Sequence, residues 1–183
     1  MLNFNFNPFP ELFSERLHLR QMTESDADDF FEMRSDKEVM KYIARPLAQT
    51  PADSLKLIRD MNEGIAHNDM INWGITLKEQ KKVIGTIGYY RAKPEHHRAE
   101  IGYLLHKKFQ KQGFMQEAIE IVLEYGFEKM GLHSIEAVID PRNLDSERIL
   151  LKNNFIKEGH FREDFYWEGE FQDSAHYSLL AGR

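Results

Sequence analysis

The spacing of apolar residues along the chain switches between a period of two and a helical period. Arg16 to Met22 alternates between two faces, which predicts a first strand. Thr23 then has the character of a helix N-cap, and the residues after it follow a helical period. Thr50 followed by Pro51 predicts a second helix start, because proline suits the first helical position. That helix extends from Ala52 to about His67.

The middle of the chain predicts three consecutive strands, Ile71 to Leu77, Lys82 to Arg91 and Arg98 to Leu105. Short polar turns join them, and such connections make antiparallel neighbours. After Gly113 the apolar residues return to helical spacing. The predicted helix ends near Met130-Gly131.

The last third predicts a strand at Ser134 to Ile139 and a helix at Asn143 to Asn153. A final pair of strands, Phe155 to Phe161 and Ser174 to Leu180, flanks a turn at Trp167-Glu168-Gly169. The predicted order is β-α-α-β-β-β-α-β-α-β-β. We therefore expect a mixed α/β (α+β) fold, in which four helices flank a mostly antiparallel sheet of about seven strands.

Composition indicates an ordinary globular protein of 183 residues, with 42% apolar and 30% charged residues. We expect one domain over residues 1–183, with residues 1–15 as an N-terminal arm. The net charge of −6 argues against a nucleic-acid partner. No apolar run approaches the ~18 residues of a membrane span, and no basic leader is present, so we expect a cytoplasmic protein without a membrane partner. Monomer and homodimer both stay open.

The chain contains no cysteine, which excludes disulfides, thiolate metal sites and a cysteine nucleophile. Two adjacent histidines, His96 and His97, would diverge from each other and could not easily hold one metal ion. No H-E-x-x-H spacing occurs either. We expect no metal site.

The most informative segment joins the strand that ends at Leu105 to the helix that begins after Gly113. Unpaired backbone N–H groups and the helix dipole make such a junction a binding site for an anion such as a pyrophosphate. Gly113 would let the backbone approach the phosphates closely. An ordinary glycine turn before a helix explains the spacing equally simply.

Several segments between Glu100 and Phe155 together resemble the GNAT superfamily of acetyltransferases. Gln110-Lys111-Gln112-Gly113-Phe114-Met115 is similar to its acetyl-CoA-binding motif, Q/R-x-x-G-x-G/A. Glu100 to Leu104, Glu117-Ala118 and Asn143 to Phe155 resemble the branch of ribosomal-protein N-terminal acetyltransferases. The resemblance covers roughly Arg16 to Leu180. At Met115 the sequence departs from the family's glycine or alanine.

The resemblance implies an acetyl-CoA-dependent N-acetyltransferase that acts on a primary amine, with a peptide or protein N-terminal α-amine as the favoured class. Without cysteine, the acetyl group would pass directly from donor to acceptor or through a different nucleophile, and we expect direct attack without a covalent enzyme intermediate. The implied coenzyme-binding residues are Ile101, Gly102, Tyr103, Gln110, Lys111, Gln112, Gly113, Phe114, Met115 and Asn143.

Two catalytic residues are implied by the same resemblance. Glu100 would be a general base acting through water, and the alternative is a strand glutamate that is paired with Arg98 or simply solvated. No second carboxylate close to Glu100 is evident in the sequence. Ser146 would bond to the coenzyme sulfur or protonate the leaving thiolate, and the alternative is a capping role in the first turn of its helix. Asn143 suits the N-cap of that helix.

A non-catalytic acyl-CoA-binding module is the alternative function, although a pure binder needs neither Glu100 nor Ser146. A Rossmann-type nucleotide site fits poorly, because no G-x-G-x-x-G motif occurs. The family's choice of acceptor involves the two early helices, their connection over Arg34 to Pro51, and the last hairpin. Aromatic residues there could line the acceptor groove or simply pack: Tyr42, Phe165, Tyr166 and Trp167.

Overall fold

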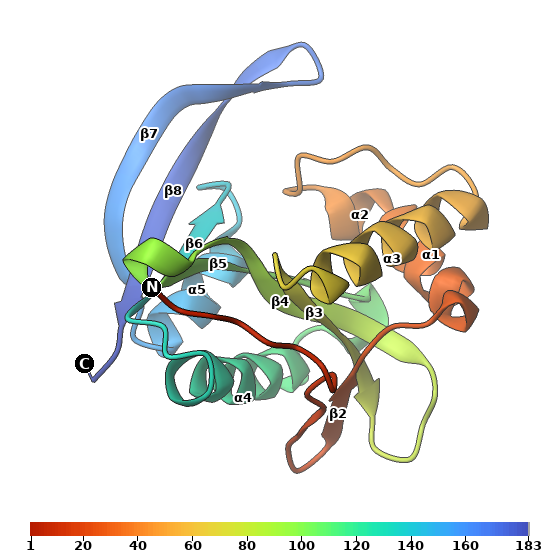
Figure 1. Cartoon of the computed structure of the whole chain (residues 1–183). Coiled ribbons are helices and arrows are strands. Elements are labelled where there is room, and N and C mark those ends of the chain that lie inside the picture. Colours follow the sequence, from red (N-terminus) through yellow and green to blue (C-terminus); the bar gives the residue numbers. More distant parts are fainter. Residues whose placement is uncertain (183) are drawn as a thin grey trace.

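An eight-stranded sheet runs through the protein in the computed structural model, which describes residues 1–182 (Figure 1). The strand order is β1-β2-β3-β4-β5-β6-β8-β7. All neighbouring strands are antiparallel except β5 and β6, which are parallel. The strands are β1 (Leu12–Phe13), β2 (Leu17–Arg20), β3 (Ile71–Leu77), β4 (Val83–Lys93), β5 (Arg98–Leu105), β6 (Ser134–Ile139), β7 (Ile156–Trp167) and β8 (Glu170–Leu180).

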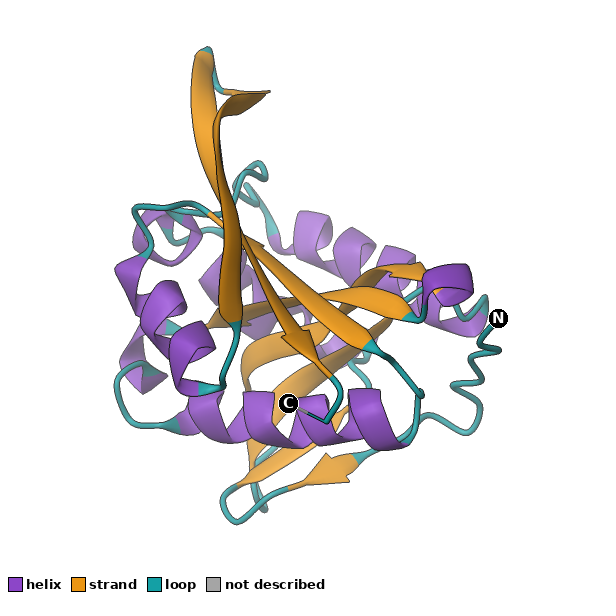
Figure 2. Ribbon diagram, turned by 90° about the vertical axis from the view of Figure 1, so that its left-hand side faces the viewer, coloured by secondary structure: helices purple, strands orange, loops and turns teal. Residues whose placement is uncertain are grey.

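Helices cover both faces of this sheet and bury its apolar side chains (Figures 1 and 2). On one face α4 packs against the larger core cluster, which contains Trp73, Ile101 and Ile119. On the other face α1 and α3 enclose a smaller cluster around Met33 and Ile58. The helices are α1 (Ala27–Arg34), α2 (Lys37–Met40), α3 (Pro51–Ala66), α4 (Phe114–Glu128) and α5 (Leu144–Lys152).

The predicted fold class and the order of the main elements are confirmed, and three details differ. The structure adds the short strand β1 and the short helix α2. The first strand is confined to Leu17–Arg20, because β3 pairs with it only over those residues. Thr23 caps a single 3₁₀ turn, Glu24–Asp26, which leads into α1.

The C-terminal hairpin is longer than the alternation pattern predicted, and its outer half projects beyond the rest of the molecule (Figure 2). It turns at Glu168 and Gly169, both with positive φ, within the predicted turn. Next to the turn, Tyr166 and Phe171 pair across the strands with ring centroids 5.0 Å apart. Because almost all of β7 is exposed, burial imposes no alternation on its sequence, which explains the early predicted end.

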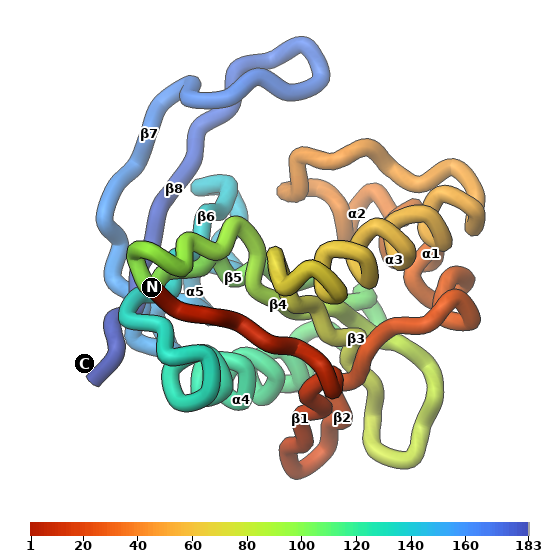
Figure 3. Tube along the Cα trace, in the orientation of Figure 1, coloured from red at the N-terminus to blue at the C-terminus, as the bar shows by residue number. Residues whose placement is uncertain are grey.

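The N-terminal segment runs across the fold before β1 begins (Figure 3). Phe4 and Phe6 are buried there and join the larger core cluster. Trp73 Nε1 donates to the carbonyl of Pro10 at 2.7 Å, which fixes the segment to β3. The expected arm is therefore packed onto the sheet.

Helix α4 lies close to the sheet because it carries a glycine opposite Tyr89. The Tyr89 side chain is fully buried and donates from its hydroxyl to the carbonyl of Val122 at 2.8 Å. A Cβ atom at Gly126 would lie 2.8 Å from Tyr89 Cζ and closer still to the hydroxyl oxygen. The missing side chain at Gly126 thus sets the spacing between α4 and β4.

We expect Gly126→Ala to lower the free energy of unfolding by about 1–3 kcal/mol, because the added methyl group overpacks a rigid site. Gly64→Ala on α3 is the matched control. Its Cβ would meet only the flexible Met70 side chain, 2.9 Å away at Cγ. The better helix propensity of alanine, about 1 kcal/mol, should leave that variant as stable as the parent or more so. Urea unfolding of both variants measures the difference, and equal effects would contradict this account.

Candidate active site

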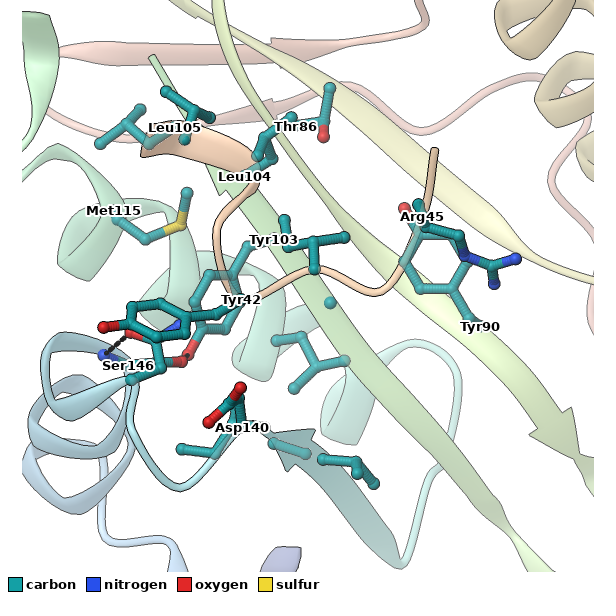
Figure 4. Close-up of a pocket in the computed structure, with 18 of the residues that line it drawn as sticks. Tyr42, Arg45, Thr86, Tyr90, Tyr103, Leu104, Leu105, Met115, Asp140 and Ser146 are labelled. Atoms are coloured by element: carbon teal, nitrogen blue, oxygen red, sulfur yellow. Dashed lines mark hydrogen bonds between the residues drawn. The ribbon is translucent and has the colours of Figure 1, made fainter. Parts of the chain in front are cut away.

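The parallel strands β5 and β6 pair over only three residues and then separate. Arg98, Ala99 and Glu100 pair with Ser134, Ile135 and Glu136, and the pairing ends there. Beyond that point β6 continues alongside β8. The backbone of β5 from residue 101 onward has no strand on that side. The gap opens into a cleft with a volume of about 1630 Å³ (Figure 4).

At the carboxyl end of β5, the chain turns into the N-terminus of α4. Gly113 is the N-cap with a φ of +83°, and Lys111 also has a positive φ of +59°. The first backbone bond of the helix runs from Glu117 N to the carbonyl of Gly113 at 3.1 Å. The N–H groups of residues 114–116 have no carbonyl partner in residues 1–182. Such free N–H groups, together with the helix dipole, are suited to binding an anion.

Side chains fold back onto this turn and leave its backbone facing outward. Gln110 Nε2 donates to the carbonyl of Leu105 at 2.9 Å, and Gln112 Nε2 donates to that of Lys108 at 2.7 Å. Phe114 and Met115 are buried in the core, where Met115 is 8% exposed. The larger side chain at Met115 therefore does not cover the turn.

Glu117 fixes this junction to the turn between β1 and β2. Its carboxylate accepts from Ser14 Oγ at 2.6 Å, from Arg16 N at 2.8 Å and from Arg16 Nε at 2.7 Å. Burial alone would raise the pKa of Glu117, but these hydrogen bonds outweigh it and lower the pKa. Arg16 also donates to the carbonyl of Gln112 at 3.0 Å. Glu117 has the structural role expected of an acidic residue in a first helical turn.

Two hydroxyl groups meet beside the gap, on the face of the sheet that α4 and α5 cover. The Tyr103 hydroxyl lies 2.6 Å from Ser146 Oγ (Figure 4). Asn143 caps α5, and its Oδ1 accepts from Ser146 N at 3.1 Å. Burial raises the pKa of Tyr103 to about 12, although the hydrogen bond with Ser146 partly opposes that rise. The Tyr103 hydroxyl is therefore protonated at neutral pH.

Glu100 points to the opposite face, because successive side chains of a strand alternate. Arg91 Nη1 donates to Glu100 Oε2 at 2.7 Å. The sequence-based alternative paired Glu100 with Arg98, but Arg98 lies 3.0 Å from Glu136 instead. The parallel register also sets Glu136 directly opposite Glu100. A second carboxylate is therefore close to Glu100, contrary to the expectation from the sequence.

Sequence reasoning missed the residues that line the cleft beyond Glu100. Tyr90 is the register partner of Glu100 on β4, and Asn72 Nδ2 donates to its hydroxyl. A Cβ atom at Gly102 would lie 3.1 Å from the Tyr90 ring, so this glycine leaves room for the ring. Arg45 lies beside Tyr90 in Figure 4. Tyr90 could have been found only from the register of β4 against β5.

The four candidate aromatic residues separate into two groups. Tyr42, Phe165 and Trp167 line the cleft. Tyr166 is 62% exposed and packs against Phe171 on the hairpin. The loop between α2 and α3 carries both Tyr42 and Arg45, so it borders the cleft on the side of the early helices.

Two kinds of feature are absent from residues 1–182. No group of three or more His, Cys, Asp or Glu side chains is arranged to hold a metal ion. No helix in this range is long and apolar enough to cross a membrane.

Comparison with known proteins gives consistent matches over nearly the whole chain. The family model described as an acetyltransferase (GNAT) domain matches residues 16–156. An uncharacterized N-acetyltransferase of Bacillus subtilis, YoaA, is 37% identical over 96% of this chain and 99% of its own length. A spermidine N(1)-acetyltransferase of Vibrio cholerae is 22% identical over 93% of this chain and 96% of its own length.

Solved structures share the fold. A GNAT-family acetyltransferase from Bacillus anthracis superposes with a TM-score of 0.83 at 29% identity, over 93% of this chain and 98% of that one. RimL, a ribosomal alpha-N-protein acetyltransferase solved in complex with coenzyme A, has a TM-score of 0.84 at 18% identity, over 93% and 98% of the two chains. With the family model and the YoaA match, these likenesses support the enzyme over the non-catalytic binding module. The chain belongs to the GNAT family and is an N-acetyltransferase.

Proposed function

We propose that the protein transfers the acetyl group of acetyl-CoA directly to a primary amine, with peptide or protein N-terminal α-amines as the preferred class. The observation that carries the proposal is the unpaired stretch of β5. It begins after Glu100, leads through the turn after Leu105 to the free N–H groups of α4, and has the Ser146–Tyr103 pair beside it. Glu100 lies about 17 Å from Leu105 along an extended strand. An extended pantetheine arm can lie along this stretch while the pyrophosphate binds the turn at Gly113.

Acetyl-CoA supplies an acetyl group on a thioester, which is already activated for attack by an amine. The chain's residues hold the thioester, polarise its carbonyl group and deprotonate the amine. Unpaired backbone N–H groups in the stretch Ile101–Tyr103 can donate to the thioester oxygen. As the new C–N bond forms and the C–S bond breaks, the amine loses a proton to Glu100 through water. The electron pair of the broken bond leaves with sulfur as a thiolate.

Ser146 and Tyr103 can stabilise that thiolate by donating hydrogen bonds. An ordinary alkyl thiol has a pKa of about 8.5. Because burial raises the pKa of Tyr103 to about 12, full proton transfer to the thiolate would be unfavourable by roughly 5 kcal/mol. The hydroxyl pair therefore acts as a hydrogen-bond donor rather than as an acid that is itself ionised.

The amine class follows from how much deprotonation the site must supply. A peptide α-amine, with a pKa of about 7.8, is neutral in roughly one molecule of seven at pH 7. A lysine side chain, at about 10.4, is neutral in roughly one of 2,500. Glu100 lies beside both Arg91 and the second carboxylate Glu136, and a base that acts through water suits a low-pKa amine. Spermidine is the acceptor named for three relatives, and RimL is named for a protein α-amine.

Gly113→Glu should abolish coenzyme A binding, because it adds a side chain and a negative charge where the phosphates bind. Gln110→Ala is the matched control in the same turn. Its side chain bonds only the carbonyl of Leu105, so the affinity should change much less. Isothermal titration calorimetry measures both affinities. Normal binding by Gly113→Glu would show that the phosphates bind elsewhere.

Ser146→Ala should lower kcat by about 10- to 100-fold, the lower part of the range for proton-transfer groups. The fold should survive, because Asn143 caps α5 through the backbone of Ser146 and not through its hydroxyl. Tyr103→Phe should have a similar effect, and the double variant should lose little more, because the two hydroxyls act as one unit. Steady-state kinetics and circular dichroism provide the measurements. An unchanged kcat in Ser146→Ala would reduce this residue to a helix-turn role.

Glu100→Gln should cost less than about tenfold at pH 7 with a peptide α-amine and should largely recover by pH 9, where the amine is neutral unaided. Glu136→Gln removes the neighbouring carboxylate and should leave the shape of the pH profile unchanged. Initial rates from pH 6 to 9 test both variants. If Glu100→Gln stays inactive at pH 9 with normal coenzyme affinity, Glu100 positions the substrate and is not the base.

A further inference from the structure

Two arginines line the cleft beyond Glu100 without an acidic partner. Arg34, at the end of α1, is only 9% exposed, whereas Arg45 is exposed on the loop between α2 and α3. Within residues 1–182, neither guanidinium forms an ion pair with a carboxylate. A buried charge without a counter-charge is costly. This cost applies to Arg34, and the nearby charge of the exposed Arg45 adds to it, so the arrangement favours an anion at this end of the cleft.

The contacts of Arg34 satisfy only part of its guanidinium. Nη2 donates to the carbonyl of Pro46 at 3.2 Å, and Nη1 lies 3.4 Å from Met40 Sδ. Both partners are neutral, so they hold the loop in place without balancing the charge. Nε is buried and has no hydrogen-bond partner. Burial, and secondarily the charge of Arg45, lower the pKa of Arg34.

Tyr90 adds a third polar group at the same place. Its hydroxyl is hydrogen-bonded to the side-chain amide of Asn72, and the residue lines the cleft. Burial raises the pKa of Tyr90 to about 12, so that the hydroxyl stays neutral, while the charges of Arg34 and Arg45 act against the rise. Figure 4 shows Arg45 beside Tyr90, with Tyr103 and Ser146 at a separate place in the pocket.

The position of this cluster separates it from the phosphates of the coenzyme. Tyr90 is opposite Glu100, at the start of the unpaired stretch of β5. The phosphate turn follows Leu105, about 17 Å along the strand. An anion at Tyr90 would therefore lie on the acceptor's side of the reacting amine.

Acidic residues also line this end of the cleft, and they do not neutralise the arginines. Glu100 is paired with Arg91 at 2.7 Å, and Asp60 is paired with Lys56 at 2.6 Å. Glu38 and Asp69 also border the cleft and are at least partly exposed, where water screens their charge.

We propose that Arg34, Arg45 and Tyr90 form a carboxylate-binding subsite for the acceptor, so that the preferred substrates are primary amines that also carry a carboxylate. The proposal rests on the proposed acetyl transfer and narrows its substrate class. The carboxylate has two sources, an acidic side chain after the N-terminal residue of a peptide or the α-carboxylate of a short free acceptor. A polyamine would bring positive charge against the two guanidiniums.

Five matched probes test the subsite: the dipeptide amides Ser-Asp, Ser-Asn and Ser-Lys, the free acid of Ser-Asn, and spermidine. We expect a KM about tenfold lower or better for the probes with a carboxylate, as charged hydrogen bonds imply. The side-chain acid and the free α-carboxylate are compared directly and identify the source. Equal KM values for Ser-Asp and Ser-Asn amides and the Ser-Asn free acid, or a preference for Ser-Lys amide or spermidine, would overturn the proposal.

Variants of Arg45 assign the effect to this residue. Arg45→Gln should remove the preference and leave the KM for acetyl-CoA unchanged, and Arg45→Glu should shift it toward Ser-Lys amide. Lys37→Gln removes the same charge from an exposed position outside the cleft and should keep the preference. A preference that survives Arg45→Gln would contradict the subsite.

A binding measurement separates this inference from the proposed function. Calorimetry with the N-acetylated dipeptide amides and coenzyme A requires no turnover. If no probe is acetylated, the proposed function fails, while tighter binding of the acetylated Ser-Asp amide than of its Ser-Asn counterpart would still support the subsite. Equal binding of the two would overturn the subsite even in an active enzyme.

Discussion

The separation of β5 and β6 is the constraint on which the site depends. These strands are the parallel pair in an otherwise antiparallel sheet, and parallel neighbours need a crossover connection. Here α4 is that crossover, and it must begin at the carboxyl end of β5. The same topology therefore leaves β5 with an unpaired edge and sets the free N–H groups of a helix at the end of that edge. The coenzyme's proposed path and its phosphate site both follow from one connection.

Because side chains alternate along β5, its candidate functional residues lie on both faces of the sheet. Glu100 faces the cleft beside α1 and α3, whereas Tyr103 faces α5 and meets Ser146. A thioester held in the gap would have a carboxylate on one side and hydroxyl donors on the other. The proposed base and the proposed hydrogen-bond donors to the thiolate are thereby kept apart, so they do not hydrogen-bond to each other.

Features that depend on residues close together in the chain were predicted from the sequence. Features that depend on pairing or packing between distant segments were missed. The order of elements, the turn at Gly113 and the cap at Asn143 follow from local spacing and were predicted with small errors at the ends. The neighbour of Glu100 was missed, because Glu136 reaches it only through the parallel register of a distant strand. The same holds for Tyr90, and for Arg34 and Arg45, whose position depends on how the early helices pack. The length of the hairpin strands was underestimated because exposed strands need no apolar alternation.

The projecting hairpin allows residues that border the cleft to change without destabilising the fold. Phe165 and Trp167 line the cleft, yet most of the residues around them on β7 and β8 lie in water. Substitutions there change little buried surface, so natural selection can alter them at small cost to folding. The packing of α4 against β4 allows no such freedom, since Gly126 and Tyr89 leave no spare volume there. Homologous enzymes can therefore keep the same binding site for the acetyl donor and differ in their acceptors through substitutions in this hairpin.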